Sequence, residues 1–174
     1  MRIFPGVEYR PEQFPGLVYR LKKPKTATLI FSSGKMVCTG SKSERQARKA
    51  VLKVVEELKR DGIVILGRPE ITVQNIVASC GLGGHIDLEK AVYGLKRTMY
   101  EPEQFPGLIY RMDEPKVVIL IFASGKLVCT GAKKETQVYT AVKKLQEILE
   151  SKNLITYEGT EKPRLPAHPA EQDE

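Results

Sequence analysis

Two identical heptapeptides, PEQFPGL, occupy positions 11–17 and 102–108 and place Phe14 and Phe105 directly before a Pro-Gly turn. Turns lie at the protein surface, so they offer little cover for an aromatic ring. Exposed apolar side chains that recur at equivalent positions point to contact with a partner. The first question that the sequence raises is therefore what covers these two rings.

Other residue types that commonly do chemistry are few and scattered. Cys38, Cys80 and Cys129 show no C-x-x-C spacing, so neither a disulfide framework nor a zinc site is indicated. We expect Cys38 and Cys129 to be half-buried strand residues. His85 follows two glycines in an expected loop, His168 lies near the C-terminus, and no set of nucleophile, base and acid recurs. The sequence therefore predicts no enzyme activity, no metal and no cofactor.

Charge is distributed unevenly over the 174 residues, which carry a formal net charge of +7. Residues 1–70 hold 15 Lys and Arg against 7 Asp and Glu, a balance of +8, whereas residues 71–174 hold 13 against 14, a balance of −1. A basic excess favours a polyanionic partner, although solvated surface cations give the same count. No apolar run approaches the roughly 20 residues of a membrane-spanning helix, so no membrane role and a reducing, intracellular location are expected.

An internal duplication organises the chain. A shift of 91 residues aligns 9–40 with 100–131, and 22 of those 32 positions are identical. Repeats of this kind predict two copies of one structural unit. We expect a first repeat over 1–66, a second over 67–157, and a proline-rich, disordered tail over 158–174.

Each repeat reads as a β-meander followed by a helix. Pro-Gly, Lys-Pro or Glu-Pro, and Ser-Gly pairs separate short apolar runs, which predicts antiparallel strands joined by turns. Ser43 and Gln46 form a capping box for the first helix, and Gly62 and Asn153 are expected to end the two helices. The apolar positions repeat at helical spacing and are Ala47, Ala50, Val51, Val54 and Leu58, then Val138, Ala141, Val142, Leu145 and Leu149.

The second repeat also has a longer front end. Residues 71–78, ITVQNIVA, alternate as a strand does, and Asp87 can cap a short helix over 88–95. Counterparts of residues 71–91 in the first repeat would lie before Met1, so 21 residues are expected to be missing through a misassigned start or a truncation. The in-frame codons upstream of Met1 would settle this point.

Strand alternation separates two faces of the expected sheet. Leu29 and Phe31 lie on one face and Thr28 and Ile30 on the other, and Leu120 and Phe122 repeat the pattern. The predicted helices suffice to cover one face. The other face is either an exposed apolar binding surface or the inside of a second layer, and the pattern leaves both alternatives open.

Four segments of the sequence resemble those of a known protein family. QNIVAS, YEPEQFPGLIYR, LIFASGK and LVCTGAKK, in this order and with most of them duplicated, are similar to the TATA-box-binding proteins over roughly residues 4–155. The compact length resembles the archaeal members. The resemblance implies an α+β fold, with a curved antiparallel β-sheet saddle and helices on the convex face. It also implies a general transcription factor that binds and bends the TATA box in the minor groove.

The resemblance further implies a role for individual residues. Phe14 with Phe31 and Phe105 with Phe122 would wedge into base steps at the two ends of the site. Minor-groove contacts are expected from Asn75, Val77, Leu29, Leu120, Val37, Val128, Thr39 and Thr130. Phosphate contacts are expected from Arg20, Arg111, Lys35 and Lys126.

Partners follow from the same resemblance. Glu101 and Glu103 match positions where the family meets transcription factor B, and Arg10 replaces Glu101 in the first repeat. RNA polymerase would join through the initiation complex, in the archaeal cytoplasm at the nucleoid or in a eukaryotic nucleus. A single-stranded RNA binder is the alternative, but the basic-Gly-aromatic signature that it predicts is missing. No small-molecule substrate is expected.

Overall fold

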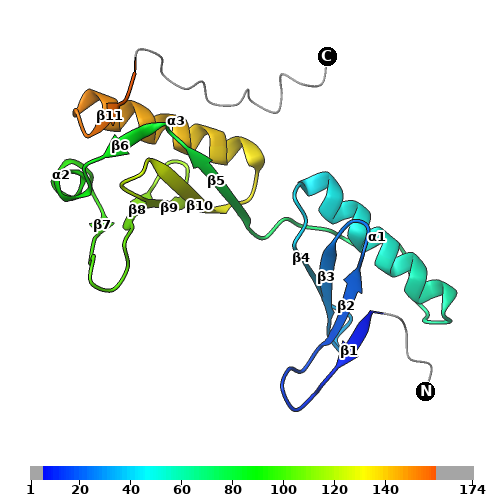
Figure 1. Ribbon diagram of the computed structural model, residues 1–174. Helices are drawn as coiled ribbons and strands as arrows, with labels where there is room; N and C mark the ends of the chain where they lie inside the picture. The colour runs from blue at the N-terminus through cyan, green and yellow to red at the C-terminus, as the bar shows by residue number, and fades with distance from the viewer. Residues whose placement is uncertain (1–5, 160–174) are drawn as a thin grey trace, which may run out of the picture. The chain divides into compact units, whose positions relative to one another are not determined.

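The computed structural model describes residues 6–159 and divides the chain into two compact units, one up to Thr72 and one from Val73 on. Each unit has its own antiparallel sheet and hydrophobic core (Figure 1). The α+β class and the antiparallel pairing are thereby confirmed. The repeat boundary after residue 66 stays a prediction, and the expected disordered tail lies outside the described residues from position 160 on.

Unit 1 is a four-stranded meander followed by one helix. Its strands lie side by side in chain order and are β1 (Val7–Tyr9), β2 (Leu17–Leu21), β3 (Thr26–Ile30) and β4 (Met36–Thr39), with α1 (Glu44–Arg60) after them. The strands end at the predicted Pro and Gly positions, because these residues cannot continue a ladder without cost. Figure 1 shows α1 on one side of this sheet.

Helix α1 begins and ends as its sequence predicts. The side chain of Ser43 accepts a hydrogen bond from the backbone nitrogen of Gln46 at 3.1 Å. Gly62, just past the helix, has a φ of 91°, which a residue with a Cβ rarely adopts. The buried stripe consists of Ala50, Val51, Val54, Val55 and Leu58, so Val55 is added to the prediction and Ala47 is only half-buried.

Unit 2 adds a front strand and a second small sheet to the same plan. Its main sheet has the order β5 (Ile76–Gly81), β10 (Lys126–Ala132), β9 (Val117–Ile121), β8 (Leu108–Met112) and β7 (Thr98–Met99). The predicted helices are present as α2 (Leu88–Gly94), capped by Asp87, and α3 (Glu135–Ser151). All five predicted apolar positions of α3 are buried, and Asn153 ends it with a φ of 53°.

Three expectations for unit 2 were wrong. The strand expected over 71–78 lies at Ile76–Gly81, because its partner β10 ends at Ala132 opposite Ile76. His85 lies in a strand, β6 (Gly84–Ile86), because β11 (Ile155–Tyr157) pairs with it. Cys129 is 1% exposed, so it is buried and not half-buried, whereas Cys38 is half-buried as expected.

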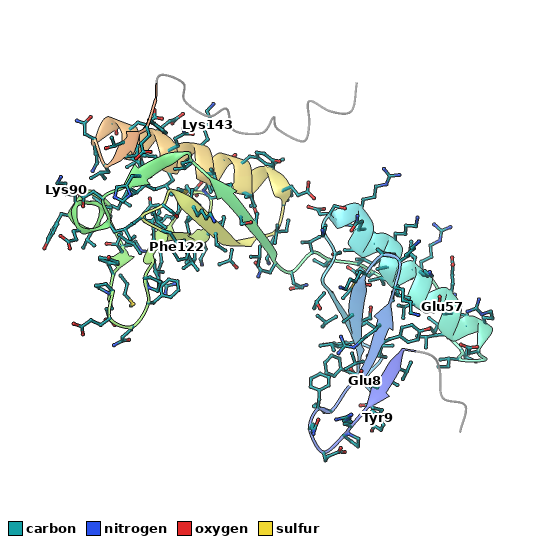
Figure 2. The ribbon with its side chains drawn as sticks, in the orientation of Figure 1. Glu8, Tyr9, Glu57, Lys90, Phe122 and Lys143 are labelled. Atoms are coloured by element: carbon teal, nitrogen blue, oxygen red, sulfur yellow. The ribbon has the colours of Figure 1, made fainter. Side chains whose placement is uncertain are left out.

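The two cores differ chemically at equivalent positions. Thr28 is fully buried, and its hydroxyl oxygen has no hydrogen-bond partner within residues 6–159, whereas unit 2 has Ile119 at this position. The hydroxyl of Tyr19 donates a hydrogen bond to Glu57 on α1, which is labelled in Figure 2. Burial and this bond raise the pKa of Tyr19 to about 12. Unit 1 therefore has Thr28 and Glu57 where unit 2 has isoleucines, Ile119 and Ile148, while both units keep the buried tyrosine.

Replacing Thr28 with valine should stabilise unit 1. The change keeps the shape and removes a buried hydroxyl without a partner, so the free energy of unfolding should rise by about 1 kcal/mol. Urea unfolding followed by circular dichroism measures this. Thr26→Val is the control, because the Thr26 hydroxyl donates to the carbonyl oxygen of Pro24 at 3.4 Å and its loss should bring no gain. A lower urea midpoint for Thr28→Val would contradict the argument.

Candidate nucleic-acid interface

Each unit brings two phenylalanine rings together at one end of its sheet. The ring centroids of Phe14 and Phe31 are 5.7 Å apart at an interplanar angle of 63°, and those of Phe105 and Phe122 are 5.8 Å apart at 67°. Both pairs have the edge-to-face geometry that aromatic rings prefer. All four rings are half-buried, so each pair covers part of its own surface and leaves part exposed. Figure 2 labels Phe122 in unit 2.

The Pro-Gly pair explains how a turn can hold such a ring. A Cβ built on Gly16 would lie 2.6 Å from the Cε1 atom of Phe14, and one on Gly107 would lie 2.7 Å from that of Phe105. Real Cβ atoms do not approach this closely, so each ring rests on a bare glycine backbone. The glycine that follows the proline thus makes room for the ring in its present position, and no unusual φ angle calls for it.

Backbone hydrogen bonds hold the two loops in the same conformation. The nitrogen of Phe14 donates to the carbonyl oxygen of Arg10, and that of Phe105 donates to Glu101, both at 2.9 Å. The nitrogen of Phe31 donates to Lys35 at 3.0 Å, as Phe122 does to its counterpart in unit 2. The duplicated sequence therefore produces a duplicated local structure.

The predicted apolar residues share the sheet face that lies opposite the helix. In unit 1 Leu29 pairs with Val37, and in unit 2 Leu120 pairs with Val128. Val37 is 44% exposed and Val77 is 64% exposed, whereas side chains of the opposite parity are packed against the helix. Within each unit, the described residues thus cover one face only. We call the uncovered face of each sheet its open face.

Sequence reasoning missed several residues of the open faces. Val18 pairs with Leu29, Ile109 pairs with Leu120, and Ser79 pairs with Val128. Strand alternation from the predicted residues would have found them, because side chains two positions apart point to the same side. The residues added in this way are Val18 and Ala27 in unit 1 and Ser79, Ile109 and Val118 in unit 2.

Asn75 is tied to strand β10 at its irregular end. Its carbonyl oxygen Oδ1 accepts a hydrogen bond from the nitrogen of Gly131 at 2.7 Å, and its Nδ2 is 3.4 Å from the hydroxyl of Thr130. The β5–β10 register shifts between Cys129 and Ala132, so the side chain of Asn75 serves a backbone group that the ladder leaves free. Since Oδ1 accepts from Gly131 and one N–H of Nδ2 donates to Thr130, the group that Asn75 can offer to a partner is its second N–H.

The four predicted cations are all exposed but have different neighbours. Arg20 forms an ion pair with Glu8, with 3.5 Å between Nε and Oε1. Arg111 lies at the equivalent place on β8, and no ion pair joins it within residues 6–159. Lys35 lies in the turn after β3, and Lys126 is the first residue of β10.

The predicted partner residues lie in the loop that carries Phe105. Glu101 and Glu103 are exposed. In unit 1, Arg10 takes the place of Glu101 in a loop with the same backbone hydrogen bonds. The two loops therefore have the same shape and opposite charge at one position.

The remaining titratable groups offer little chemistry. Burial raises the pKa of the Cys129 thiol to about 11 and raises that of Cys80, so both stay neutral and weakly nucleophilic near neutral pH. Within residues 6–159, no three His, Cys, Asp or Glu side chains are grouped to hold a metal. None of the helices there combines the length and apolar character of a bilayer span.

The open faces combine an apolar floor, single hydrogen-bond donors, cations and a pair of rings at one end of each sheet. Such a surface suits a polyanion with flat apolar parts, which is the description of a nucleic acid.

Comparisons with known proteins agree with this description. The family described as "Transcription factor TFIID (or TATA-binding protein, TBP)" matches residues 1–60 and 70–152. The TATA-box-binding protein of Pyrodictium occultum is 61% identical over 149 residues, which are 86% of this chain and 75% of the relative. That of Aeropyrum pernix is 57% identical over 149 residues, 86% of this chain and 73% of the relative.

A solved structure extends the likeness to the fold. The structure described as Methanococcus jannaschii TBP has a TM-score of 0.78 and 51% sequence identity, covering 86% of this chain and 85% of that one. The relatives named here are archaeal, in line with the archaeal resemblance of the sequence. The family consists of transcription factors and not of enzymes, which confirms the expectation that the chain is not an enzyme. The chain belongs to the TATA-box-binding protein family.

Proposed function

We propose that this protein is a general transcription factor that binds the TATA box in the minor groove, bends it, and recruits transcription factor B and RNA polymerase. The observation that carries the proposal is the pair of half-buried phenylalanines at one end of each open face. Family membership supports the DNA target, and the open faces would make the contacts with it. The protein would act in the archaeal cytoplasm, on the DNA of the nucleoid.

The ring pairs suit wedging better than stacking. A base needs a flat, exposed aromatic face to stack on, whereas each ring here meets its neighbour edge to face. Two such rings present a blunt apolar edge, which can enter an opened base step. This arrangement favours a duplex minor groove over the alternative of a single-stranded RNA.

The energetics require more than the rings alone. Unstacking one base step costs a few kcal/mol. Fully burying a phenylalanine returns roughly 1.5–3 kcal/mol, but each ring is already half-buried, so a pair returns about as much as one ring. The remaining free energy must come from burial of the apolar side chains of the open faces, such as Leu29 and Val37 or Leu120 and Val128. Bending therefore requires both the phenylalanine pairs and these open-face side chains.

Base preference would come from a few donors and from DNA shape. An A·T pair offers only acceptors in the minor groove, and a guanine would add an amino group there. The free N–H of Asn75 fits an acceptor, and Thr39 and Thr130 can act as hydrogen-bonding neighbours. Arg20, Arg111, Lys35 and Lys126 would contact phosphates, which adds affinity without base preference. An A·T-rich site with easily deformed steps is therefore the preferred target.

Binding to three ligands at matched salt tests the function. We expect an A·T-rich TATA duplex to bind at least about tenfold more tightly than a G·C-rich duplex or single-stranded RNA of equal length. Fluorescence transfer between dyes on the duplex ends should report a shortened end-to-end distance. Equal binding to all three ligands would reduce the protein to a general polyanion binder, and preference without bending would contradict the wedge.

The same assay assigns the wedge to its residues. Phe105→Ala combined with Phe122→Ala should abolish bending on one side and leave weak, salt-sensitive binding. Phe14→Ala with Phe31→Ala should remove the bend on the other side. Tyr93→Ala is the matched control, because Tyr93 is an exposed aromatic residue on α2 and should affect neither quantity.

Asn75→Asp should separate the structural role of this residue from its role in binding. The carboxylate can still accept the hydrogen bond from Gly131, so thermal unfolding should change little. It offers no donor and adds a negative charge on the open face, so affinity for the A·T duplex should fall by about tenfold or more. Asn153→Asp, which adds the same charge beyond α3, should bind normally. A variant that folds and binds like the wild type would exclude Asn75 from the contact.

Charge reversal at Glu101 tests partner recruitment. Glu101→Arg gives the second loop the residue that the first loop has, so DNA binding should persist while addition of transcription factor B to the complex fails. A gel-shift assay with both proteins resolves the two steps. Arg10→Glu should leave recruitment by the second loop intact. If Glu101→Arg still recruits transcription factor B as the wild type does, the loop is not the contact.

A further inference from the structure

The two open faces differ in how their arginines are neutralised. In unit 1, Glu8 lies opposite Val18 on the edge strand β1, and Arg20 lies two residues further on the same face of β2. Their side chains form an ion pair with 3.5 Å between Nε and Oε1. Diagonal neighbours of this kind are within reach across an antiparallel pair. Glu8 is labelled on β1 in Figure 2.

Unit 2 has a neutral residue at the place of Glu8. Met99 on β7 lies opposite Ile109, as Glu8 lies opposite Val18, and it is 53% exposed. Arg111, the counterpart of Arg20, is therefore without a carboxylate partner on its edge strand. The same register thus holds an ion pair in one repeat and a free guanidinium in the other.

Other charges nearby do not restore the symmetry. In unit 2 two carboxylates, Asp113 and Glu114, follow the end of β8. Asp113 pairs with Arg97, and Glu114 is exposed and forms no ion pair among the described residues. Unit 1 has Lys22 just after β2, exposed and without an ion pair among the described residues. Cations and carboxylates are therefore present at both edges. The difference concerns the strand arginine, because Glu8 forms an ion pair with Arg20, whereas neither Asp113 nor Glu114 forms one with Arg111.

We propose that Glu8 competes with DNA phosphate for Arg20, so that Arg111 of unit 2 contacts phosphate more strongly than Arg20 of unit 1. The inference rests on the proposed function. An exposed ion pair is weak, with a median worth of roughly 0–1 kcal/mol, so a phosphate can displace it. The carboxylate nevertheless stays beside the bound phosphate and repels it. The two units, whose sheets are otherwise duplicated, would then bind DNA phosphate unequally.

Exchange of the two residues tests the proposal. Glu8→Met should raise affinity for the TATA duplex roughly three- to tenfold at low salt and steepen the slope of log K against log salt by up to about 0.9, the value for one added phosphate contact. Met99→Glu should do the reverse in unit 2. Glu8→Gln removes the charge with little change of shape, and should reproduce the effect of Glu8→Met if methionine disturbs β1.

Glu56→Gln is the matched control, because it removes one exposed carboxylate from α1, on the other side of the sheet. Its salt slope should equal that of the wild type. The inference is overturned if Glu8→Gln and Glu56→Gln behave alike, or if Met99→Glu leaves affinity unchanged. A wild-type protein that fails to prefer the TATA duplex defeats the proposed function instead, so the two failures are distinguishable.

Discussion

A β-sheet has two faces, and each unit of this protein has one long amphipathic helix with which to cover them. Helices α1 and α3 pack against the side that carries Tyr19 and Leu21 in unit 1, and their equivalents in unit 2. The opposite side keeps valine and leucine in contact with solvent. Burial of these side chains against a ligand is favourable. The exposed apolar face is therefore a consequence of having one long helix for two sheet faces.

Strand alternation and helical spacing predicted most of the framework, because both depend on the residues of one element at a time. The apolar stripe of α3 and the open-face positions Leu29 and Val128 are examples. The errors concern pairing between distant segments. His85 is a strand residue because its segment pairs with Ile155–Tyr157, which follows α3. Asn75 likewise accepts a hydrogen bond from Gly131, which lies 56 positions later in the sequence. A local sequence pattern cannot predict such contacts between residues that are far apart in the chain. The roles of the site residues stay proposals.

Duplication made the loops and ring pairs alike, while the surroundings diverged. Unit 2 has Ile119 and Ile148 where unit 1 has Thr28 and Glu57, so its core is the more apolar. Ile63, Val64 and Leu66 are exposed in unit 1. In unit 2 the equivalent segment pairs with β6, and Leu154 and Ile155 in it are buried. β4 also forms a sheet edge where its counterpart β10 is paired on both sides. The repeats share the loops and the ring pairs, and they differ in how completely the surrounding chain encloses their apolar residues.

Each phenylalanine of a PEQFPGL loop rests on a glycine, and this contact has a consequence for binding. The ring cannot sink toward the backbone, because Cε1 already occupies the space that a Cβ of Gly16 or Gly107 would need. The height of the ring above the sheet is thus set during folding. Each ring is thus supported from below before any ligand arrives, and a side chain that is already in place loses less conformational entropy on binding.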